Sequence, residues 1–399
     1  MKLSNRINQM KFSPIRKLSP YAQTAREKGL KVLGLNIGQP DIETPPQFFE
    51  ALKDFNDPVL KYSESRGESV LLDSFIRYYK DYGIEFTHEN LIITNGGSEA
   101  LHFALFATCN EDEEVIIPEP FYTNYSSFTD IAGCVVRPIT TYGEEGFHLP
   151  SKETFEAIIN EKTRAILISN PSNPTGTVYT KEEIRMLADL CLEHNLYLIS
   201  DEVYREFVYD DLEVFSPMDL KDMEDRVILI DSISKRYSAC GARIGLVASR
   251  NTDIINAMMK MAQSRLCAPT LEQVAAASLY DTPKSYFQKV KTEYQERRDL
   301  LFHGISQIKD VKVKKPTGAF YMIIELPIHN AEDFCMWMLK DFSYKNTTIM
   351  MAPAEGFYLT KGLGVKEVRL SYCINQEDLS LAVEILELAL KEYLAKHNA

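Results

Sequence analysis

Residues 227–235 read Val-Ile-Leu-Ile-Asp-Ser-Ile-Ser-Lys, in which the apolar run Val227–Ile230 changes abruptly into mostly polar side chains. A short, uninterrupted apolar run is typical of a strand that is buried on both faces. Four more runs of this kind stand earlier in the chain, at Leu91–Thr94, Glu114–Pro118, Ala165–Ser169 and Leu196–Ser200. Helical patterns separate them, at Ser98–Thr108 and Lys181–His194. This alternation predicts an α/β fold with a mainly parallel sheet flanked by helices.

The C-terminal part of the chain has a different pattern, which starts after Pro283. Residues 284–309 predict one long amphipathic helix with Arg297 and Arg298 on its solvated face. The elements expected after it are strands at Ala319–Leu326 and Val368–Cys373 and a final helix at Leu379–Lys396. Since one hydrophobic core rarely serves 399 residues, we expect two domains. These are a large domain at 47–288 and a smaller α+β domain at 289–399, to which residues 1–46 contribute.

The composition is that of a globular protein with an acidic balance. The 44 Lys and Arg residues face 57 Asp and Glu residues, a net charge of −13, which disfavours a nucleic-acid partner. No run of about 18 apolar residues predicts a membrane helix, and the first residues have no signal-peptide pattern. The seven scattered cysteines are typical of reduced thiols in a cytoplasmic protein. The seven histidines show no metal-ligand spacing.

Polar residues stand where four of the predicted strands end, and ligands of open parallel sheets collect at that edge. Residues 92–100 read Ile-Ile-Thr-Asn-Gly-Gly-Ser-Glu-Ala, in which glycines and a helix N-terminus favour a phosphate. A tight turn with Ser98 as the helix cap explains the same residues. The serine-hydrolase pattern Gly-x-Ser-x-Gly does not fit, because Ala100 replaces its last glycine.

The next two strands end in an amide and in an acid. Residues 170–176 read Asn-Pro-Ser-Asn-Pro-Thr-Gly, and the paired Asn-Pro steps hold Asn173 at the strand end, unless this is a plain loop. Residues 198–204 read Leu-Ile-Ser-Asp-Glu-Val-Tyr. Asp201 is either the cap of a following helix or a carboxylate that pairs with a protonated pyridine nitrogen. Tyr204 is expected on the same side of that helical turn.

Lys235 follows the last of these strands. Most lysines are surface charges, but this one stands among small hydroxyl residues after a buried strand. An amine in such a position is able to form a Schiff base with an aldehyde cofactor. Ser232 and Arg243 are suited to hold a phosphate, the arginine through a bidentate pair.

In this order, the motifs resemble the class I aminotransferases of the aspartate aminotransferase type. The resemblance spans roughly residues 30–390 and includes further matching segments. These are Asn-Ile-Gly-Gln-Pro-Asp at 36–41, Tyr62, Pro-Glu-Pro-Phe-Tyr at 118–122, Pro-Thr-Gly-Ala-Phe-Tyr at 316–321 and Val-Arg-Leu-Ser-Tyr at 368–372. It implies the type I fold of pyridoxal-phosphate-dependent transferases, in which the large domain binds pyridoxal 5'-phosphate.

The resemblance implies a role for each matching residue. Lys235 would carry the cofactor as a Schiff base and then move the substrate α-proton. Asp201 would bind the pyridine nitrogen. Asn173 and Tyr204 would contact the phenolic oxygen of the ring, and Tyr122 would stack on its face.

Other matching residues would hold the phosphate and the substrate. The residues expected around the phosphate are Gly97, Ser98, Glu99, Ser232 and Arg243. Tyr62 would reach the phosphate of a neighbouring subunit, which implies a homodimer with shared active sites. Arg369 would clamp the substrate α-carboxylate, helped by the backbone of Gly38 and the side chain of Asn173.

The implied reaction is a ping-pong amino transfer from an amino acid to a 2-oxo acid. The expected donor is aspartate and the expected acceptor is 2-oxoglutarate, with an aromatic or neutral amino acid as the alternative donor. Relatives that use aspartate often have a lysine at the position of Ser98, where it meets the distal carboxylate; here that lysine is absent. Arg66 and Arg265 are either its replacements or ordinary surface arginines.

Three other functions share part of this pattern. A carbon–sulfur lyase of the same fold would have the same residues, but it would release pyruvate and ammonia without an oxo-acid acceptor. A transcription regulator with a related domain would need a DNA-binding module first, whereas the resemblance begins near residue 30. A serine hydrolase acting through Ser98 would leave Lys235, Asp201 and Arg369 unexplained.

Overall fold

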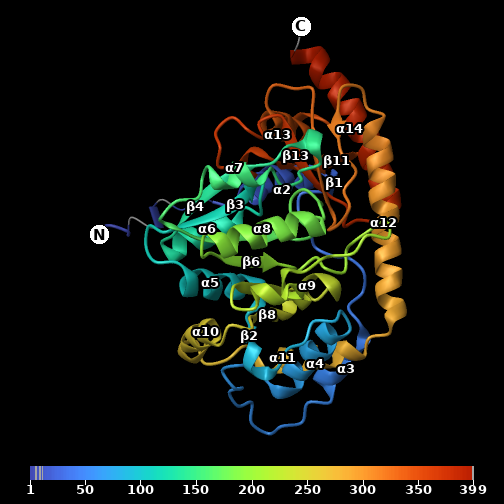
Figure 1. Cartoon of the computed structure of the whole chain (residues 1–399). Helices are drawn as coiled ribbons and strands as arrows, with labels where there is room; N and C mark the ends of the chain where they lie inside the picture. The colour runs from blue at the N-terminus through green and yellow to red at the C-terminus, as the bar shows by residue number, and fades with distance from the viewer. Residues whose placement is uncertain (5–6, 9, 11, 398–399) are drawn as a thin grey trace.

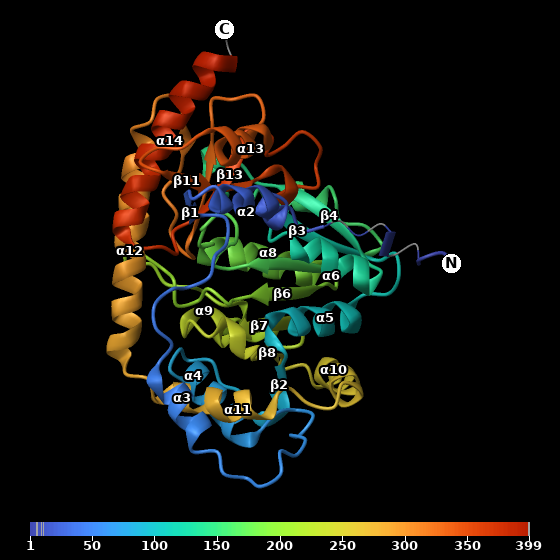
Figure 2. The ribbon, with the colours of Figure 1, turned by 180° about the vertical axis from the view of Figure 1, so that it is seen from behind.

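The computed structural model describes residues 1–4, 7–8, 10 and 12–397 (Figure 1, Figure 2). Among these residues the largest sheet has seven strands in the order β2-β8-β7-β6-β5-β3-β4. The strands are β2 (Leu91–Thr94), β3 (Glu114–Glu119), β4 (Val135–Thr140), β5 (Thr163–Ser169), β6 (Tyr197–Asp201), β7 (Val227–Ser232) and β8 (Gly245–Ala248). Neighbours pair in parallel, except that β8 is antiparallel to both β2 and β7. The predicted fold class is confirmed.

The helices of this part of the chain precede, separate and follow these strands in the sequence. They are α3 (Pro46–Lys53), α4 (Ser69–Lys80), α5 (Gly96–Thr108), α6 (Asn124–Ala132), α7 (Lys152–Glu156), α8 (Lys181–Glu193), α9 (Ile233–Arg236), α10 (Thr252–Ser264) and α11 (Thr270–Ala277). The five predicted strands all form, with ends shifted by no more than two residues. The apolar-run criterion missed β4, which alternates exposed and partly covered residues, and it also missed β8, a four-residue strand that begins with Gly245.

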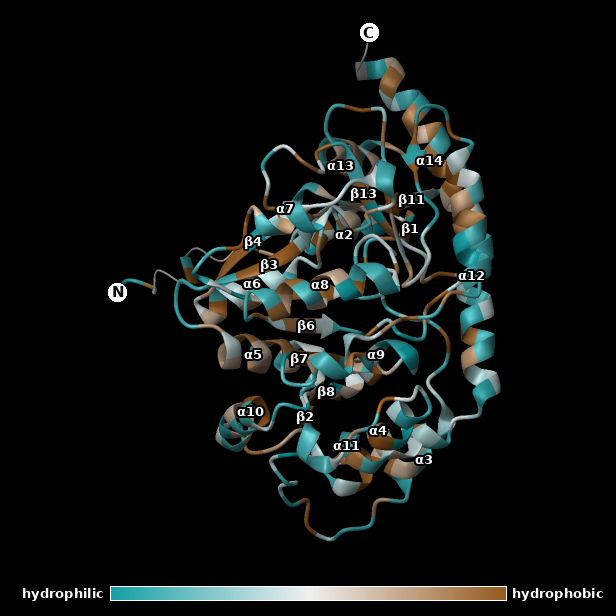
Figure 3. Cartoon of the chain, in the orientation of Figure 1, coloured by the Kyte–Doolittle hydropathy of each residue, from teal (hydrophilic) through white to brown (hydrophobic). Residues whose placement is uncertain are grey.

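Both faces of the large sheet are buried. Successive residues of a strand point to opposite faces, and each set packs into its own hydrophobic core. Ile166 and Ile168 of β5 belong to a core that includes α4, α8 and α11. Ala165 and Leu167 belong to a second core that includes α5, α6 and α10. Because helices cover both faces, the strands need no alternation of apolar and polar residues. Accordingly, β3 and β6 are coloured brown, for hydrophobic residues, in Figure 3. The ends of the strands are therefore the places where polar groups reach solvent.

The C-terminal part contains a four-stranded antiparallel sheet in the order β12-β13-β10-β9, and a parallel pair β1-β11. Its elements are β1 (Lys31–Gly34), β9 (Lys312–Val313), β10 (Tyr321–Glu325), β11 (Thr347–Met350), β12 (Ala352–Pro353), β13 (Glu367–Ser371), α2 (Ser19–Glu27), α12 (Lys284–Ser306), α13 (Ala331–Asp341) and α14 (Gln376–His397). Because β1 pairs with β11, the N-terminal segment lies beside this part. The domain boundaries at 46 and 288 stay a prediction.

The long helix α12 forms as expected and runs along one side of the molecule (Figure 1). The prediction that Arg297 and Arg298 lie on its solvated face is wrong, because both are buried. Arg297 pairs with Asp41 at 2.7 Å, and Arg298 pairs with Asp210 at 2.7 Å. These carboxylates come from distant segments of the chain, so the periodicity of α12 by itself did not reveal them. A buried guanidinium needs such partners.

Two further expectations concern cysteines and membranes. All seven cysteines are free, and Cys240 and Cys267 are the ones that are not fully buried. No helix within the described residues is long and apolar enough to cross a membrane.

Candidate active site

A cavity of about 310 Å³ opens where β5, β6 and β7 end, beside Ser169, Asp201 and Ser232. It brings together most of the residues that the sequence singled out. Those that line it are Gly38, Gly97, Ser98, Tyr122, Asn173, Asp201, Tyr204, Ser232, Lys235, Arg243 and Arg369. They come from elements that lie far apart in the chain, and the fold gathers them at one edge of the large sheet.

Glu99 and Tyr62 do not line this cavity. Glu99, in the first turn of α5, accepts a hydrogen bond from the backbone N–H of Asn95 at 2.8 Å and lies 3.5 Å from Arg265. Tyr62 lies between α3 and α4 with 80% of its surface exposed. Within a single chain, Tyr62 therefore does not contribute to the site.

Lys235 is presented by the short helix α9, which Ser232 caps by accepting a hydrogen bond from the backbone N–H of Ser234. Its amine donates to the carbonyl oxygen of Gly38 at 3.0 Å. The rings of Tyr204 and Phe320 lie 6.0 and 5.8 Å from it. Among the described residues no carboxylate pairs with this amine, so neutral groups hold it in the cavity.

Asp201, the last residue of β6, is a buried acid without a cationic partner among the described residues. Its carboxylate accepts hydrogen bonds from the Tyr125 hydroxyl at 2.7 Å and from the backbone N–H of Val203 at 3.3 Å. Burial raises the pKa of Asp201 to about 6, because the charged form is desolvated. A positive charge in the cavity would stabilise the ionised form, and a protonated pyridine nitrogen is such a charge.

Tyr204 reaches the cavity, but not by the expected route. The prediction that Asp201 and Tyr204 share a helical turn is wrong, because turns replace a helix after β6. The backbone bends so that the backbone N–H of Tyr209 donates a hydrogen bond to the carbonyl oxygen of Thr317. The Tyr204 hydroxyl still lies 3.0 Å from that of Tyr321 and accepts a hydrogen bond from the Asn173 amide at 3.4 Å.

Arg369 on β13 is buried and connects three parts of the chain. Its guanidinium donates to the side-chain oxygen of Asn173 at 2.9 Å and to the backbone carbonyl of Asn36 at 2.6 Å. Its Nε–H is buried and has no partner among the described residues. Only 2% of Arg369 is exposed, and this burial lowers the pKa of its guanidinium because the charged form is desolvated. An incoming carboxylate would supply the missing acceptor and the counter-charge.

The opposite part of the cavity is suited to an anion. The N-terminus of α5 supplies backbone N–H groups at Gly97 and Ser98. Arg243 has a left-handed backbone, with φ of 55°, and its guanidinium lies so close to Gly96 that a Cβ at that position would overlap it. The hydroxyls of Ser232 and Ser234 are 2.7 Å apart and also face the cavity. These donors fit a phosphate group.

Several cavity residues were missed by the sequence analysis. Tyr125, which bonds to Asp201, and Tyr321, which bonds to Tyr204, both lie within or near motifs already quoted. Their roles in the site depend on side-chain directions that a motif does not specify. Cys240 and Arg16 line the cavity as well, and no sequence pattern singled out either residue.

The two arginines suggested as replacements for a lysine at Ser98 have partners elsewhere in their own chain. Arg66 donates to the backbone carbonyls of His88, Glu89 and Leu91 at 2.9–3.3 Å. Arg265 donates to the carbonyl of Ile93 at 2.8 Å and to that of Ser65 at 3.3 Å. Neither lines the cavity. Within one chain, then, both hold the backbone rather than face a ligand.

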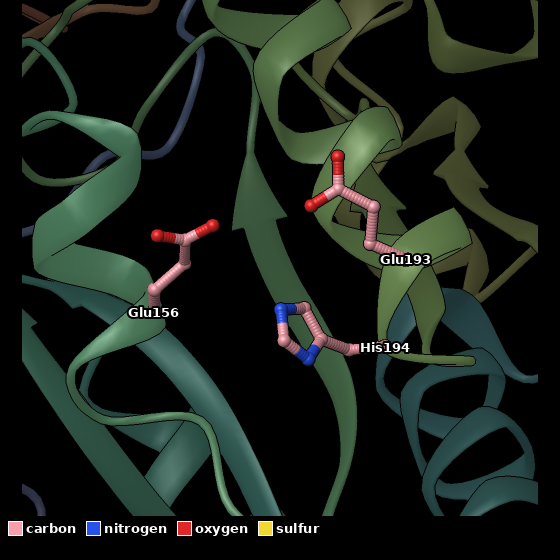
Figure 4. A group of neighbouring side chains, drawn as sticks. All are labelled: Glu156, Glu193 and His194. Atoms are coloured by element: carbon pink, nitrogen blue, oxygen red, sulfur yellow. The ribbon is translucent and has the colours of Figure 1, made fainter.

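A cluster of possible metal ligands lies outside the cavity. Glu156 of α7, Glu193 of α8 and the adjacent His194 are all exposed (Figure 4). The amine of Lys152 lies 2.6 Å from Glu193 and 3.7 Å from Glu156. Because this lysine already balances the two carboxylates, the cluster is explained as a surface ion-pair network.

Comparisons with known proteins agree over nearly the whole chain. A family model described as aminotransferase class I and II matches residues 31–386. The aspartate aminotransferase of Bacillus subtilis (strain 168) is 30% identical and covers 100% of both chains. The aromatic-amino-acid aminotransferase 2 of Thermococcus litoralis is 31% identical over 98% of this chain and 99% of its own. The crystal structure of an aspartate aminotransferase from Thermotoga maritima, 30% identical, has a TM-score of 0.89 over 98% of this chain and 100% of that one.

Fold and cavity together define an enzyme that uses pyridoxal 5'-phosphate, since the site offers an amine, a buried acid and an anion-binding end. The family match makes this specific: the chain belongs to the aminotransferases of class I and II. It is a pyridoxal-phosphate-dependent aminotransferase, and its reaction transfers an amino group between an amino acid and an oxo acid.

Replacement of Lys235 tests the amine. Lys235→Ala should lower turnover by on the order of 10⁴-fold, the upper range for loss of a positioned acid–base group, because no other amine faces Asp201 within the described cavity. It should also remove the visible absorption of the lysine-linked cofactor. Initial rates and absorption spectra measure both effects. Lys260→Ala, an exposed lysine on α10, is the control, and normal turnover in Lys235→Ala would refute the assignment.

The raised pKa of Asp201 has a consequence for the cofactor-free protein. The folded protein holds the proton up to about pH 6, whereas the unfolded chain releases it near pH 4, so folding stability falls as the pH rises through this window. At pH 7.5, cofactor-free Asp201→Asn should therefore be more stable than the wild type, by about 2 to 3 kcal/mol.

Urea unfolding of the two cofactor-free proteins at pH 7.5 and near pH 4 measures this difference, which should vanish at the lower pH. Titration with pyridoxal 5'-phosphate should show weaker binding by Asp201→Asn, because the neutral amide offers no counter-charge to the ring nitrogen. Equal stability of both proteins at pH 7.5 would contradict the raised pKa.

Proposed function

We propose that this enzyme transfers the amino group of aspartate to 2-oxoglutarate by a ping-pong mechanism. The observation that carries the proposal is the buried guanidinium of Arg369, which lines the same cavity as the Lys235 amine and whose Nε–H has no acceptor among the residues that the structure describes. An α-amino acid presents a carboxylate and an amine on one carbon, and these two residues match both groups. Aspartate is proposed because relatives named aspartate aminotransferase match across the chain.

The cavity residues divide the work as follows. Bound pyridoxal 5'-phosphate supplies a reactive aldehyde and an electron-withdrawing ring. Arg369 and Asn173 hold the α-carboxylate, and the Gly38 carbonyl directs the Lys235 amine toward the centre of the cavity. Once that amine is free and neutral, it removes the α-proton of the substrate and later returns a proton.

The remaining residues would hold the cofactor. Asp201 would keep a positive charge on the ring nitrogen, and Tyr125 orients this carboxylate through its 2.7 Å hydrogen bond. Tyr204 and Asn173, which are hydrogen-bonded to each other, would contact the phenolic oxygen. Tyr122 would stack on the ring face. Gly97, Ser98, Ser232 and Arg243 would hold the phosphate, with Glu99 nearby in the first turn of α5.

A specific observation favours an aromatic donor as the second candidate. The position where aspartate-specific relatives often have lysine is occupied here by Ser98, and the cavity is lined by the rings of Tyr122, Tyr204 and Tyr321. The relative from Thermococcus litoralis is named an aromatic-amino-acid aminotransferase. A carbon–sulfur lyase activity remains the alternative within the same fold.

A panel of donors and acceptors tests the proposal directly. With 2-oxoglutarate as the acceptor, we expect kcat/KM for aspartate to exceed that for alanine and phenylalanine by at least about tenfold, the effect of one lost charge-assisted contact. Oxaloacetate and glutamate should form in equal amounts. Pyruvate and ammonia released without an acceptor would point to the lyase instead, and a higher value for phenylalanine would favour the aromatic alternative.

We also propose that the enzyme is a cytoplasmic homodimer with shared active sites. Tyr62 is 80% exposed, and it lies next to the exposed apolar residues Val59 and Leu60. A second copy that covers this segment would place Tyr62 at the neighbouring phosphate. The seven free cysteines support a reducing compartment.

Tyr62→Ala should weaken the binding of pyridoxal 5'-phosphate by about tenfold, because one hydrogen bond to a charged phosphate is lost. At a pyridoxal 5'-phosphate concentration too low to load Tyr62→Ala, mixing it with inactive Lys235→Ala subunits should raise the activity, since the mixed dimer contains one intact site. Tyr142→Ala, another exposed tyrosine, is the control. A monomeric native protein in analytical ultracentrifugation would overturn the shared-site arrangement.

A further inference from the structure

The charges that line the cavity are unbalanced. Among the described residues, four cationic side chains face it, namely Arg16, Lys235, Arg243 and Arg369, against the single carboxylate of Asp201. The proposed function uses three of the four cations. Lys235 would bind the cofactor and transfer the α-proton, Arg243 would bind the phosphate, and Arg369 would bind the α-carboxylate. Arg16 is left without a ligand group.

The backbone around Arg16 is tied to the substrate-binding residues. Arg16 ends the turn η1 (Pro14–Arg16), and the neighbouring carbonyl of Ile15 accepts a hydrogen bond from the Asn36 amide at 3.3 Å. The backbone carbonyl of Asn36 in turn accepts from Arg369 at 2.6 Å. A single residue thus anchors both the turn that presents Arg16 and the guanidinium that faces the α-carboxylate.

A second contact supports the same turn. Pro14 lies so close to Gly356 that a Cβ at position 356 would overlap the proline ring. The turn is therefore seated on the segment after β12, next to the cavity, rather than extended into solvent. Its position explains how a residue so near the N-terminus comes to line the site.

The side chain of Arg16 is free for a ligand. It is exposed, and among the described residues its guanidinium has no hydrogen-bond or ion-pair partner. Burial raises the pKa of the Tyr122 hydroxyl, and the charges of Arg369, Arg243 and Arg16 all act against that rise. Arg16 and Arg369 are thus both close enough to influence one hydroxyl in the cavity wall. Tyr122 lies within the electrostatic reach of both cations.

We propose that Arg16 binds the side-chain carboxylate of a dicarboxylic substrate, with Arg369 binding its α-carboxylate. The proposal rests on the proposed amino-transfer function and specifies its substrate class. An arginine suits this task, because its fork of N–H donors matches both carboxylate oxygens. It also accounts for Ser98, since a cation presented by η1 makes a lysine at that position unnecessary. Arg66 and Arg265 are occupied by backbone carbonyls.

Binding of unreactive acids to the holoenzyme tests this without turnover. Succinate has two carboxylates and butyrate has one on a chain of the same length, so the ratio of their Kd values reports the second contact. Isothermal titration calorimetry should show that the wild type prefers succinate. Arg16→Ala should lose roughly tenfold to a hundredfold of succinate affinity and little butyrate affinity.

Two variants guard against a loss of folding. Arg16→Lys keeps the positive charge and should therefore recover part of the succinate preference that Arg16→Ala loses. If Arg16→Ala instead lost the preference because its turn had collapsed, restoring the charge would have no such effect. Lys17→Ala removes an adjacent exposed charge that pairs with Glu332 at 2.6 Å and does not line the cavity, so it should bind succinate as the wild type does. Unchanged succinate binding by Arg16→Ala, or no succinate preference in the wild type, would overturn the proposal.

Steady-state rates separate this proposal from the choice of donor. Arg16→Ala should lower kcat/KM for aspartate and for 2-oxoglutarate by the same factor as it lowers the affinity for succinate. Its kcat/KM for alanine should stay within about threefold of the wild-type value, the usual scatter of such effects. If the wild type does not use aspartate while succinate binding still depends on Arg16, then the proposed donor fails and the role of Arg16 stands. If the wild type uses aspartate and Arg16→Ala uses it equally well, the proposed donor stands and the role of Arg16 fails.

Discussion

The hydrogen bonds of Arg369 join the parts of this enzyme that make up its active site. The guanidinium comes from β13 in the C-terminal sheet, and it contacts Asn173 after β5 of the large sheet and the backbone of Asn36 after β1. Because the group is buried, each donor must find an acceptor. The geometry of the cavity therefore depends on the mutual placement of two sheets and the N-terminal segment. The Nε–H of Arg369, which finds no acceptor in the described part of the chain, remains for a substrate.

The cavity keeps several charged groups in positions that are unfavourable until ligands arrive. Asp201 is buried and has no cationic partner within the described ranges, and burial raises its pKa to about 6. Burial lowers the pKa of Arg369, and Arg243 has a left-handed backbone. Desolvated charges and a strained backbone cost folding free energy. A ligand that carries opposite charges at matching positions would relieve that cost, so binding of cofactor and substrate should stabilise the fold.

Much of this site was accessible from the sequence, because the fold turns order along the chain into position in space. Parallel strands that are buried on both faces leave polar residues only at their ends, so Asn173, Asp201 and Lys235 had to meet at one edge. The reasoning failed where side chains act between elements. Arg297 was expected in solvent, yet it is buried against Asp41, which lies far away in the chain. Tyr204 was expected on a helix that does not form.

The sequence by itself determined the fold class, the cofactor chemistry and the identity of eleven residues that line the cavity. Each of these follows from short-range patterns that repeat the family's motifs. The tertiary structure alone decided which further groups join them. Tyr125 and Tyr321 enter the cavity through their side-chain directions, and Arg16 enters because η1 folds back onto Asn36 and Gly356. No local pattern contains such information, because these contacts link residues whose separation along the chain bears no relation to their separation in space.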